Sequence, residues 1–425
     1  MADDAGVLID QLWIILAAAL VMLMTPAVGL FYGGLVRQKN VLSTVMYSFF
    51  TLAIVSIVWA AVGFSLSFGS SVGGIIGSFE HAGLRGLDPS GGPGSTDSYI
   101  FMLFQMTFAV ITPALISGAF AERKRFGAFV MFTVLWCLLV YTPVAHWVWG
   151  GGWLSSMVLF GESGLLDFAG GKVVHITSGV SALVCAFVLG RRHGDRQQIQ
   201  PHNATLTVLG ASLLWFGWFG FNGGSALGVN GQAINAITNT HLAASTAAIV
   251  WLTLAWIHHG KPSVIGAAVG AVAGLVGITP AAGYVMPVSS IAIGLVTAIA
   301  CFYATEYVVK GRVDDALDVF GVHGVGGIFG AILTAVLASS AAPGNGVGGL
   351  IEGNTGLFFR QLLGVLIVAA FSGTATFLIL KCMSLVLDLR VSEADETTGL
   401  DRSQHGESIL PSGLTGEDQR PQLQQ

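Results

Sequence analysis

The chain has 425 residues, of which 53% are hydrophobic and 10% are charged, and its formal net charge is −5 at pH 7. An ordinary soluble domain has about 25% charged residues, so this composition excludes a water-soluble fold and indicates an integral membrane protein. The 58 glycines favour closely packed transmembrane helices over a strand-built barrel, whose spans alternate polar and apolar residues.

Eleven stretches are long and apolar enough to cross a bilayer as helices, which needs about 20 residues. They lie near residues 10–32, 42–68, 98–121, 126–148, 173–190, 203–228, 237–257, 262–277, 286–308, 323–340 and 357–388. The first stretch follows an acidic start, Met1-Ala2-Asp3-Asp4, rather than the basic segment of a signal peptide, so we expect it to be a mature span.

Basic residues predict the orientation, because cytoplasmic loops accumulate Lys and Arg. The odd-numbered connections hold Arg37, Lys39, Arg123, Lys124, Arg125, Arg191, Arg192, Arg196, Lys261, Lys310 and Arg312. The even-numbered connections hold only Arg85, Lys172 and Arg360. The N-terminus is therefore expected outside and the C-terminus inside. Residues 1–388 form the predicted transmembrane domain, and the polar residues 389–425, which cannot bury a core, form a predicted cytoplasmic tail.

Three similarities between the two halves of the chain predict an internal repeat. Ile111-Thr112-Pro113-Ala114 recurs as Ile278-Thr279-Pro280-Ala281, Phe31-Tyr32-Gly33-Gly34 resembles Phe221-Asn222-Gly223-Gly224, and His175 in span five parallels His323 in span ten. Together they fit an inverted five-plus-five repeat, with span eleven as an extra helix.

His175 and His323 are ionisable groups in apolar, glycine-rich spans, where such groups are costly and indicate function. Two facing neutral imidazoles can satisfy each other and leave their outer nitrogens to a polar substrate. The alternative is two separate histidines, each bonded to a backbone carbonyl, but the repeat favours a pair. A metal site is not expected, because neither histidine has a ligand three or four residues away.

Asp167 opens span five, eight residues before His175. A helix N-terminus accommodates a carboxylate, which accepts hydrogen bonds from the free backbone amides. This capping role is one interpretation. In the other interpretation, the negative charge of Asp167 also lowers the free energy of a cation that approaches the outer mouth. Both interpretations can hold at once.

Aromatic residues gather near the outer ends of several spans. An interfacial belt explains many tryptophans without any site. Phe104 and Phe108, however, are one helical turn apart and share a face, and a small cation gains roughly 0.5–2 kcal/mol over each such ring. Ser225, four residues after Phe221, adds a hydroxyl acceptor. Phe104 and Phe108 with Ser225 can thus form a cage for a monovalent cation, and the other aromatic residues that gather near the outer ends are Trp149, Trp218 and Phe221.

The segments Asp-Phe-Ala-Gly-Gly-Lys-Val-Val-His at 167–175 and Asp-Val-Phe-Gly-Val-His-Gly-Val at 318–325 resemble the ammonium transporter family, the Amt branch of the ammonium transporter and Rhesus superfamily. The resemblance runs from Gly-Leu-Phe-Tyr-Gly-Gly-Leu-Val-Arg at 29–37 to Gly-Leu-Asp-Arg-Ser-Gln-His-Gly-Glu at 399–407. It implies a homotrimer in the cell membrane with one pore through each subunit, and a transporter rather than an enzyme. No cofactor, metal or nucleic-acid partner is expected.

The resemblance also implies roles for individual residues. Phe104, Phe108, Trp149 and Ser225 match the family's outer ammonium-recruitment site, Phe108 and Phe221 its aromatic gate, and His175 and His323 its paired pore histidines. Asp167 matches the acid near the mouth, Trp218 a pore-wall aromatic and Thr279 a polar group near the pore. The chain departs from the family at Lys172, where a small or hydroxylated residue is common; we place Lys172 in the outer loop.

We therefore expect the protein to recruit ammonium, remove a proton and conduct neutral ammonia past the histidines while the proton crosses separately, so that transport is electrogenic. Methylammonium is a further expected substrate. The alternatives are a Rhesus-like channel for neutral gas, an ammonium sensor and a membrane enzyme with histidine-ligated haem. The resemblance further suggests a trimeric nitrogen-signalling partner of the PII type at the cytoplasmic face, to which a tail that extends through His405 and Glu407 would respond.

Overall fold

The computed structural model describes residues 2–159, 162–194, 200–309 and 312–409. Regular structure in these ranges is helical apart from two antiparallel hairpins of two-residue strands. The hairpins pair β1 (Ser71–Val72) with β2 (Ile76–Gly77), and β3 (Val158–Leu159) with β4 (Glu162–Ser163).

Ten helical segments among the described residues are long and apolar enough to cross a membrane. They are Ala5–Leu35, Gln38–Phe68, Tyr99–Phe120, Phe126–Val148, Gly171–Leu189, Ala204–Gly224, Gly231–His259, Pro287–Tyr307, Phe320–Leu337 and Thr355–Met383. Each coincides with a predicted span to within several residues. The remaining prediction, near 262–277, coincides with α10 (Val264–Ile278), an apolar helix of 15 residues.

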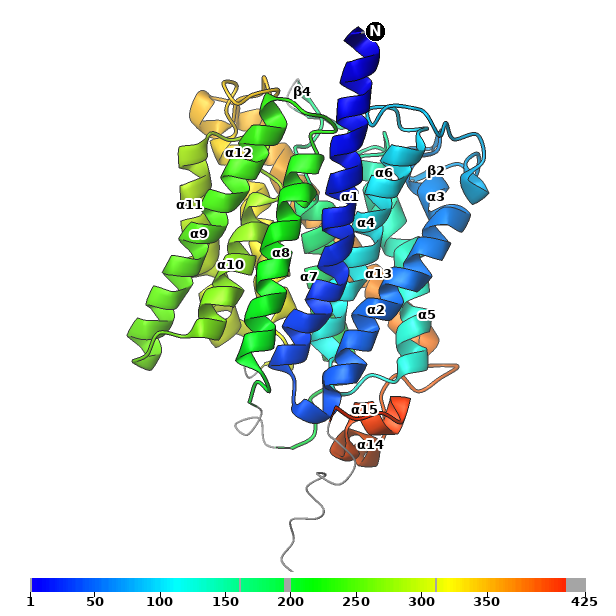
Figure 1. The fold of residues 1–425 in the computed structure, drawn as a ribbon, viewed down its shortest axis with the longest axis vertical. Coiled ribbons are helices and arrows are strands. Elements are labelled where there is room, and N and C mark those ends of the chain that lie inside the picture. Colours follow the sequence, from blue (N-terminus) through cyan, green and yellow to red (C-terminus); the bar gives the residue numbers. More distant parts are fainter. Residues whose placement is uncertain (1, 160–161, 195–199, 310–311, 410–425) are drawn as a thin grey trace, which may run out of the picture.

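The helices stand side by side and roughly parallel in one bundle (Figure 1). The α-helices of the bundle are α1 (Ala2–Leu35), α2 (Val41–Val58), α3 (Phe64–Phe68), α4 (Tyr99–Ile116), α5 (Phe126–Trp136), α6 (Thr142–Val148), α7 (Thr177–Leu189), α8 (Ala204–Gly224), α9 (Gly231–His259), α10, α11 (Pro287–Tyr303), α12 (Val325–Leu337) and α13 (Thr355–Met383). Large apolar side chains are exposed on the outward helix faces, including Ile57, Phe187 and Ile249 at 66–69% exposure. A surface of this kind suits contact with lipid rather than water.

Several spans switch from α-helical to π-helical hydrogen bonding. The π-helical segments are η2 (Trp59–Gly63), η5 (Cys137–Tyr141), η6 (Gly171–Ile176), η8 (Ala304–Val309) and η9 (Phe320–Gly324). Shorter 3₁₀ turns are η1 (Gln38–Asn40), η3 (Ala82–Leu84), η4 (Ser117–Phe120) and η10 (Leu350–Glu352). Since π-helical turns are often found at functional sites, η6 and η9 are notable because they carry the two histidines of interest.

Two glycines let these histidine-bearing segments cross closely. A Cβ atom on Gly179 would lie 2.1 Å from the backbone nitrogen of Gly324, next to His323. Reciprocally, a Cβ atom on Gly327 would lie 3.0 Å from the Cβ atom of His175. Each glycine stands four residues after the histidine of its own segment, so α7 approaches η9 in the way that α12 approaches η6.

The C-terminal segment packs against the end of the bundle opposite the start of α1 (Figure 1). It contains α14 (Glu393–Thr398) and α15 (Leu400–His405). Leu400 is fully buried, and the Asp401 carboxylate accepts hydrogen bonds from the backbone N–H groups of Leu42 and Ser43, at 3.0 and 2.8 Å, where α2 begins. We call the end of the bundle that carries α14 and α15 the tail end, and the other the N-terminal end.

Candidate functional site: a narrow pore with a histidine pair

A cluster of aromatic rings lies where α4 and α8 meet. The ring centroids of Phe104 and Phe108 are 5.0 Å apart, and those of Phe108 and Trp149 are 5.9 Å apart. The rings of Phe104, Phe108 and Phe221 are each only 1% exposed, so they are not part of an interfacial belt. The Ser225 hydroxyl donates to the Phe221 carbonyl at 2.8 Å, which leaves its oxygen free to accept a hydrogen bond.

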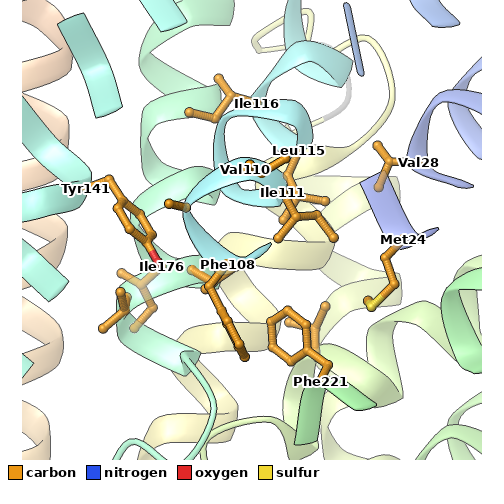
Figure 2. Close-up of a cluster of buried hydrophobic side chains, with 14 of the residues drawn as sticks. Met24, Val28, Phe108, Val110, Ile111, Leu115, Ile116, Tyr141, Ile176 and Phe221 are labelled. Atoms are coloured by element: carbon orange, nitrogen blue, oxygen red, sulfur yellow. The ribbon is translucent and has the colours of Figure 1, made fainter. Parts of the chain in front are cut away.

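Phe108 and Phe221 face each other at the base of this cluster (Figure 2). Their centroids are 4.4 Å apart and their planes are tilted by 49°. Apolar side chains surround the two rings, among them Met24, Val28 and Ile111. The two rings therefore pack directly against each other within apolar surroundings.

His175 and His323 form a direct hydrogen bond below these rings. Their Nδ1 atoms are 3.2 Å apart, and the ring planes are inclined by 25°. Because one Nδ1 must carry the proton and the other must accept it, the pair fixes the tautomer of both rings relative to each other. His175 Nε2 is buried and has no hydrogen-bond partner among the described residues.

Trp218 packs against the His175 ring of the histidine pair. Its ring lies nearly parallel to that of His175, at 20° and 5.6 Å between centroids. The indole N–H donates to the Thr279 hydroxyl at 2.9 Å, and this hydroxyl in turn donates to the Leu275 carbonyl. Thr279 thus orients Trp218, and Trp218 limits the movement of His175.

The Asp167 carboxylate caps η6. Its Oδ1 accepts the backbone N–H groups of Gly170 and Gly171 at 3.1 and 2.6 Å, and its Oδ2 accepts those of Lys172 and Val173 at 2.8 and 3.3 Å. The Asp167 carbonyl accepts the indole N–H of Trp149 at 2.9 Å, which joins the cap to the aromatic cluster. The capping interpretation is therefore correct in its geometry, and the carboxylate is only 5% exposed.

Lys172 is not in a loop, as the sequence analysis had placed it. It is the second residue of η6 and is fully buried, because η6 starts two residues before the predicted span. Its ammonium group donates to the Leu166 carbonyl at 3.1 Å.

Two cavities adjoin the histidine pair. The first has a volume of about 10 Å³, barely enough for one water molecule, and is lined by apolar side chains together with His175, His323 and Tyr32. The second has a volume of about 540 Å³ and shares His323, Tyr32 and Phe31 with the first. We call the second cavity the vestibule.

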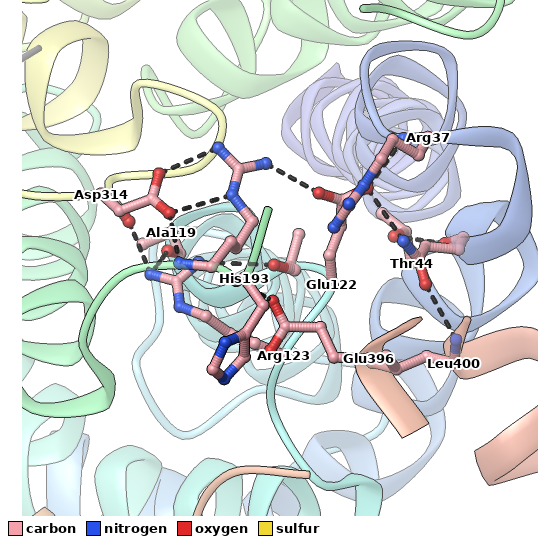
Figure 3. A network of polar contacts seen from close by, with 12 residues as sticks. Arg37, Thr44, Ala119, Glu122, Arg123, His193, Asp314, Glu396 and Leu400 are labelled. Atoms are coloured by element: carbon pink, nitrogen blue, oxygen red, sulfur yellow. Dashed lines mark hydrogen bonds and ion pairs between the residues drawn. The ribbon is translucent and has the colours of Figure 1, made fainter. Parts of the chain in front are cut away.

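Charged residues hold together the loops around the vestibule at the tail end (Figure 3). The Arg192 guanidinium forms ion pairs with Asp314 at 2.9 Å and with Glu122 at 2.8 Å. Glu122 also accepts a hydrogen bond from the Arg37 guanidinium at 2.9 Å. Burial alone would raise the pKa of Glu122, but the guanidiniums of Arg192 and Arg37 lower it to about 2. Burial opposes the charge of Asp314 in the same way, and Arg192 holds its pKa well below its usual range.

Asp315, which was not among the predicted site residues, lines the vestibule and is 6% exposed. Its Oδ2 accepts the backbone N–H of Phe320 at 2.7 Å, so it caps η9 as Asp167 caps η6. The signal was present in the sequence. Asp315 stands eight residues before His323, as Asp167 stands eight residues before His175.

The fold defines a multi-pass helical membrane protein, and its candidate site comprises a buried aromatic cluster, a hydrogen-bonded histidine pair and two adjoining cavities. The ammonium transporter family model matches residues 12–409. The chain is 50% identical to the ammonium transporter of Bacillus subtilis, over 95% of this chain and 99% of the relative. It resembles the solved structure of Candida albicans Mep2, with a TM-score of 0.84 and 38% identity over 91% of this chain and 87% of that one.

A structure described as a sensor Amt protein is also similar, with a TM-score of 0.85 and 31% identity over 95% of this chain and 100% of that one. The chain belongs to the ammonium transporter family. It is an ammonium transporter of the membrane and not an enzyme, which removes the haem-enzyme alternative.

Proposed function

We propose that the protein recruits the ammonium ion at Phe104, Phe108, Trp149 and Ser225, removes its proton above the Phe108 and Phe221 gate, and conducts ammonia past His175 and His323. The observation that carries this proposal is the 3.2 Å hydrogen bond between the two Nδ1 atoms in an otherwise apolar pore. A pair of imidazoles provides a polar track without a permanent charge.

The recruitment step rests on the aromatic cluster. Phe104 and Trp149 each pack edge-to-face on Phe108, and Ser225 stands one helical turn after Phe221, whose ring also contacts Phe108. A monovalent cation gains roughly 0.5–2 kcal/mol per ring, with the larger value when water is excluded. Potassium and ammonium have similar size and charge, so this site alone does not select between them.

Selection follows from deprotonation, because potassium has no proton to lose. The 10 Å³ cavity beyond the gate has no room for a hydration shell, and an unpaired ion is strongly disfavoured there. Ammonium divides into ammonia and a proton near Asp167 and the gate. Ammonia passes the histidines, and the proton moves along the imidazoles and transient water, so each cycle carries one positive charge.

Replacing both histidines tests the relay directly. His175→Ala with His323→Ala should abolish the ammonium-driven current of the reconstituted protein, because the imidazole track is lost. His259→Ala, which removes an exposed histidine from the end of α9, should leave the current unchanged. A full-sized current in the double variant, with potassium still rejected, would show that no relay runs through the histidines.

We also propose the finer architecture that the family resemblance implies. It comprises eleven transmembrane helices, with α10 as the short one, an inverted five-plus-five repeat, an outer N-terminus and an inner C-terminus. Residues 1–388 form the transmembrane domain, and residues 389–425 form a cytoplasmic tail. The opposite positions of the start of α1 and of α14 support the odd number of spans (Figure 1). The matching histidine, aspartate and glycine spacings of η6 and η9 support the repeat.

The assembly and partners follow the same proposal. The protein forms a homotrimer, accepts methylammonium as well as ammonium, and presents its tail end to a PII-type regulator in the cytoplasm. Size-exclusion chromatography with light scattering tests the trimer. A monomer in a mild detergent and in lipid nanodiscs would contradict it.

Sensing is a second candidate function, favoured by the likeness to the solved sensor Amt protein. A sensor binds ammonium without sustained current, whereas a Rhesus-like gas channel changes internal pH without current. Simultaneous recording of current and internal pH separates the three functions. The proposed mechanism requires a current that rises with the ammonium gradient.

A further inference from the structure

Lys172 is a buried lysine that lies beside the proposed outer site. It is the second residue of η6, three positions before His175, and its side chain is fully buried. Among the described residues, its Nζ forms one hydrogen bond, to the Leu166 carbonyl at 3.1 Å, and no ion pair. An ionisable group in an apolar span is costly and indicates a function.

Lys172 and Trp149 are bound to neighbouring peptide groups. Lys172 Nζ donates to the Leu166 carbonyl, and the Trp149 indole donates to the next carbonyl along the chain, that of Asp167, at 2.9 Å. The backbone N–H of Lys172 also donates to Asp167 Oδ2 at 2.8 Å. The lysine charge is therefore fixed on the short segment that holds the Trp149 ring against Phe108.

The helix α13 holds this segment independently of Lys172. The Gln361 side-chain amide donates to the same Leu166 carbonyl at 2.6 Å. The Arg360 guanidinium donates to the Gly164 carbonyl at 3.1 Å. Because a buried lysine without an ion pair lowers the stability of the fold, a structural role does not account for Lys172.

The Lys172 charge offsets that of Asp167. A lysine carries one positive charge and a carboxylate one negative charge at neutral pH, so the two side chains together contribute no net charge to the outer site. The four backbone N–H groups that Asp167 accepts satisfy its carboxylate further. An ammonium ion near Phe108 and Trp149 therefore gains from the rings while the lysine repels it.

We propose that Lys172 promotes the deprotonation of ammonium at the outer site, because a fixed positive charge disfavours the cation relative to neutral ammonia. The inference rests on the proposed recruitment and deprotonation steps and assigns a further residue to them. One N–H bond breaks, its electron pair stays on nitrogen as the ammonia lone pair, and the proton leaves for transient water and then the histidines. Lys172 neither donates nor accepts that proton and acts through its charge.

Full-length protein in excised outside-out patches tests this role, because the outer ammonium concentration can then be varied. Lys172→Met should lower the half-saturating outer concentration roughly three- to tenfold, since the repulsion is lost, and lower the saturating current by a similar factor, since deprotonation slows. Structural damage would not combine tighter binding with a smaller current. Lys172→Gln keeps a donor for the Leu166 carbonyl without the charge and should behave in the same way.

Lys124→Met is the matched control. It also removes the charge of a fully buried lysine, but Lys124 lies at the tail end, where its backbone pairs with that of Arg390. The half-saturating outer ammonium concentration and the saturating current of this variant should both equal those of the unmodified protein.

The outcomes separate the inference from the mechanism beneath it. If the unmodified protein carries no ammonium current, the proposed transport mechanism fails. If it carries current but a Lys172 variant keeps its half-saturating concentration or its saturating current, or Lys124→Met reproduces the change, the role of Lys172 alone is wrong. Either Lys172 variant that folds decides. Both should fold, because a neutral side chain removes the cost of the buried charge, and failure of both to fold would make Lys172 structural and overturn the proposal.

Discussion

The two ends of the pore treat charge in different ways. Towards the N-terminal end, three phenylalanine rings of the candidate site are buried, and both oxygens of the Asp167 carboxylate are bonded to the backbone. At the tail end, the vestibule is lined by several carboxylates together with Arg192, and one oxygen of Asp315 has no hydrogen-bond partner among the described residues. The two capping aspartates, Asp167 and Asp315, should therefore respond differently to substitution.

The largest expected effect is the difference in stability loss between substitutions of the two capping aspartates, Asp167 and Asp315. Asp167→Ala leaves four buried backbone N–H groups without an acceptor, so we expect the free energy of unfolding to fall by roughly 3–6 kcal/mol, or folding to fail. Asp315→Ala frees one such group and should cost about 1 kcal/mol. Thermal unfolding in detergent measures both. Equal losses would mean that the caps do not differ as described.

The next effect concerns the ionic network that holds the tail end together. Glu122→Gln leaves Arg192 and Arg37 with a neutral partner in a buried place, and should cost about 2–4 kcal/mol of stability at pH 7. The pKa of Glu122 is lowered from 4.5 to about 2, so its stabilising contribution is complete above pH 4.5 and is lost as pH falls towards 2.

As pH falls from 4.5 to 2, the unfolding temperature of the wild type should therefore decrease towards that of the Glu122→Gln variant. If the difference in unfolding temperature between the two proteins stays constant between pH 4.5 and 2, the stabilisation does not come from the Glu122 charge.

A smaller effect is expected at the recruitment site. Trp149→Leu should raise the half-saturating outer ammonium concentration roughly two- to thirtyfold, the equivalent of about 0.5–2 kcal/mol of cation–ring interaction, and leave the saturating current nearly unchanged. Trp153→Leu is the matched control, because Trp153 lies nearby but packs on Trp147 rather than Phe108. A loss of saturating current with unchanged affinity would place Trp149 outside the recruitment step.

The smallest expected effect is at Lys124, a buried charge near the tail end that the transport path does not use. Its ammonium nitrogen lies 4.1 and 3.9 Å from the ring centroids of Phe120 and Phe132, and burial lowers its pKa to about 8. The charged form is therefore disfavoured in the folded state. The free energy by which this charge destabilises the fold grows as pH falls from 10.5 to about 8.

Lys124→Met should accordingly keep or slightly raise the unfolding temperature at pH 7, with a change of about 1 kcal/mol or less. The advantage of the variant should shrink as pH rises from 8 to 10.5. A strong destabilisation at pH 7 would give Lys124 a structural role that its ring contacts do not explain.

The composition and the apolar runs were sufficient to predict a helical membrane protein and the approximate position of ten spans. The helix α10 was also predicted in position, but at 15 residues it is shorter than the ten candidate spans, so its crossing of the membrane stays a prediction. The C-terminal segment was underestimated. Its polar residues bury no core of their own, yet Leu400 and Asp401 are buried against α2. The burial of Leu400 and Asp401 depends on contacts between segments that are distant in sequence, and a hydropathy pattern contains no information about such contacts.

The same limit applies to the candidate site. The repeat pointed to His175 and His323 as a pair, but only the crossing of α7 and η9 at Gly179 shows how closely they approach. Lys172 was misplaced because hydropathy starts a span late when a lysine stands in its first turn. Asp315 was missed although its spacing from His323 repeats that of Asp167, because the spacing gains meaning only when both carboxylates are seen to cap π-helical turns.

The central claim is that charge leaves ammonium at the outer gate and crosses the pore as a separate proton. The most direct test is the current through the reconstituted unmodified protein, recorded together with internal pH, with ammonium, methylammonium and potassium over a pH series. The account predicts current with ammonium, a smaller one with methylammonium and none with potassium, and loss of the ammonium current when both His175 and His323 are alanine. A potassium current comparable to that of ammonium, or a rise in internal pH without any current, would contradict it.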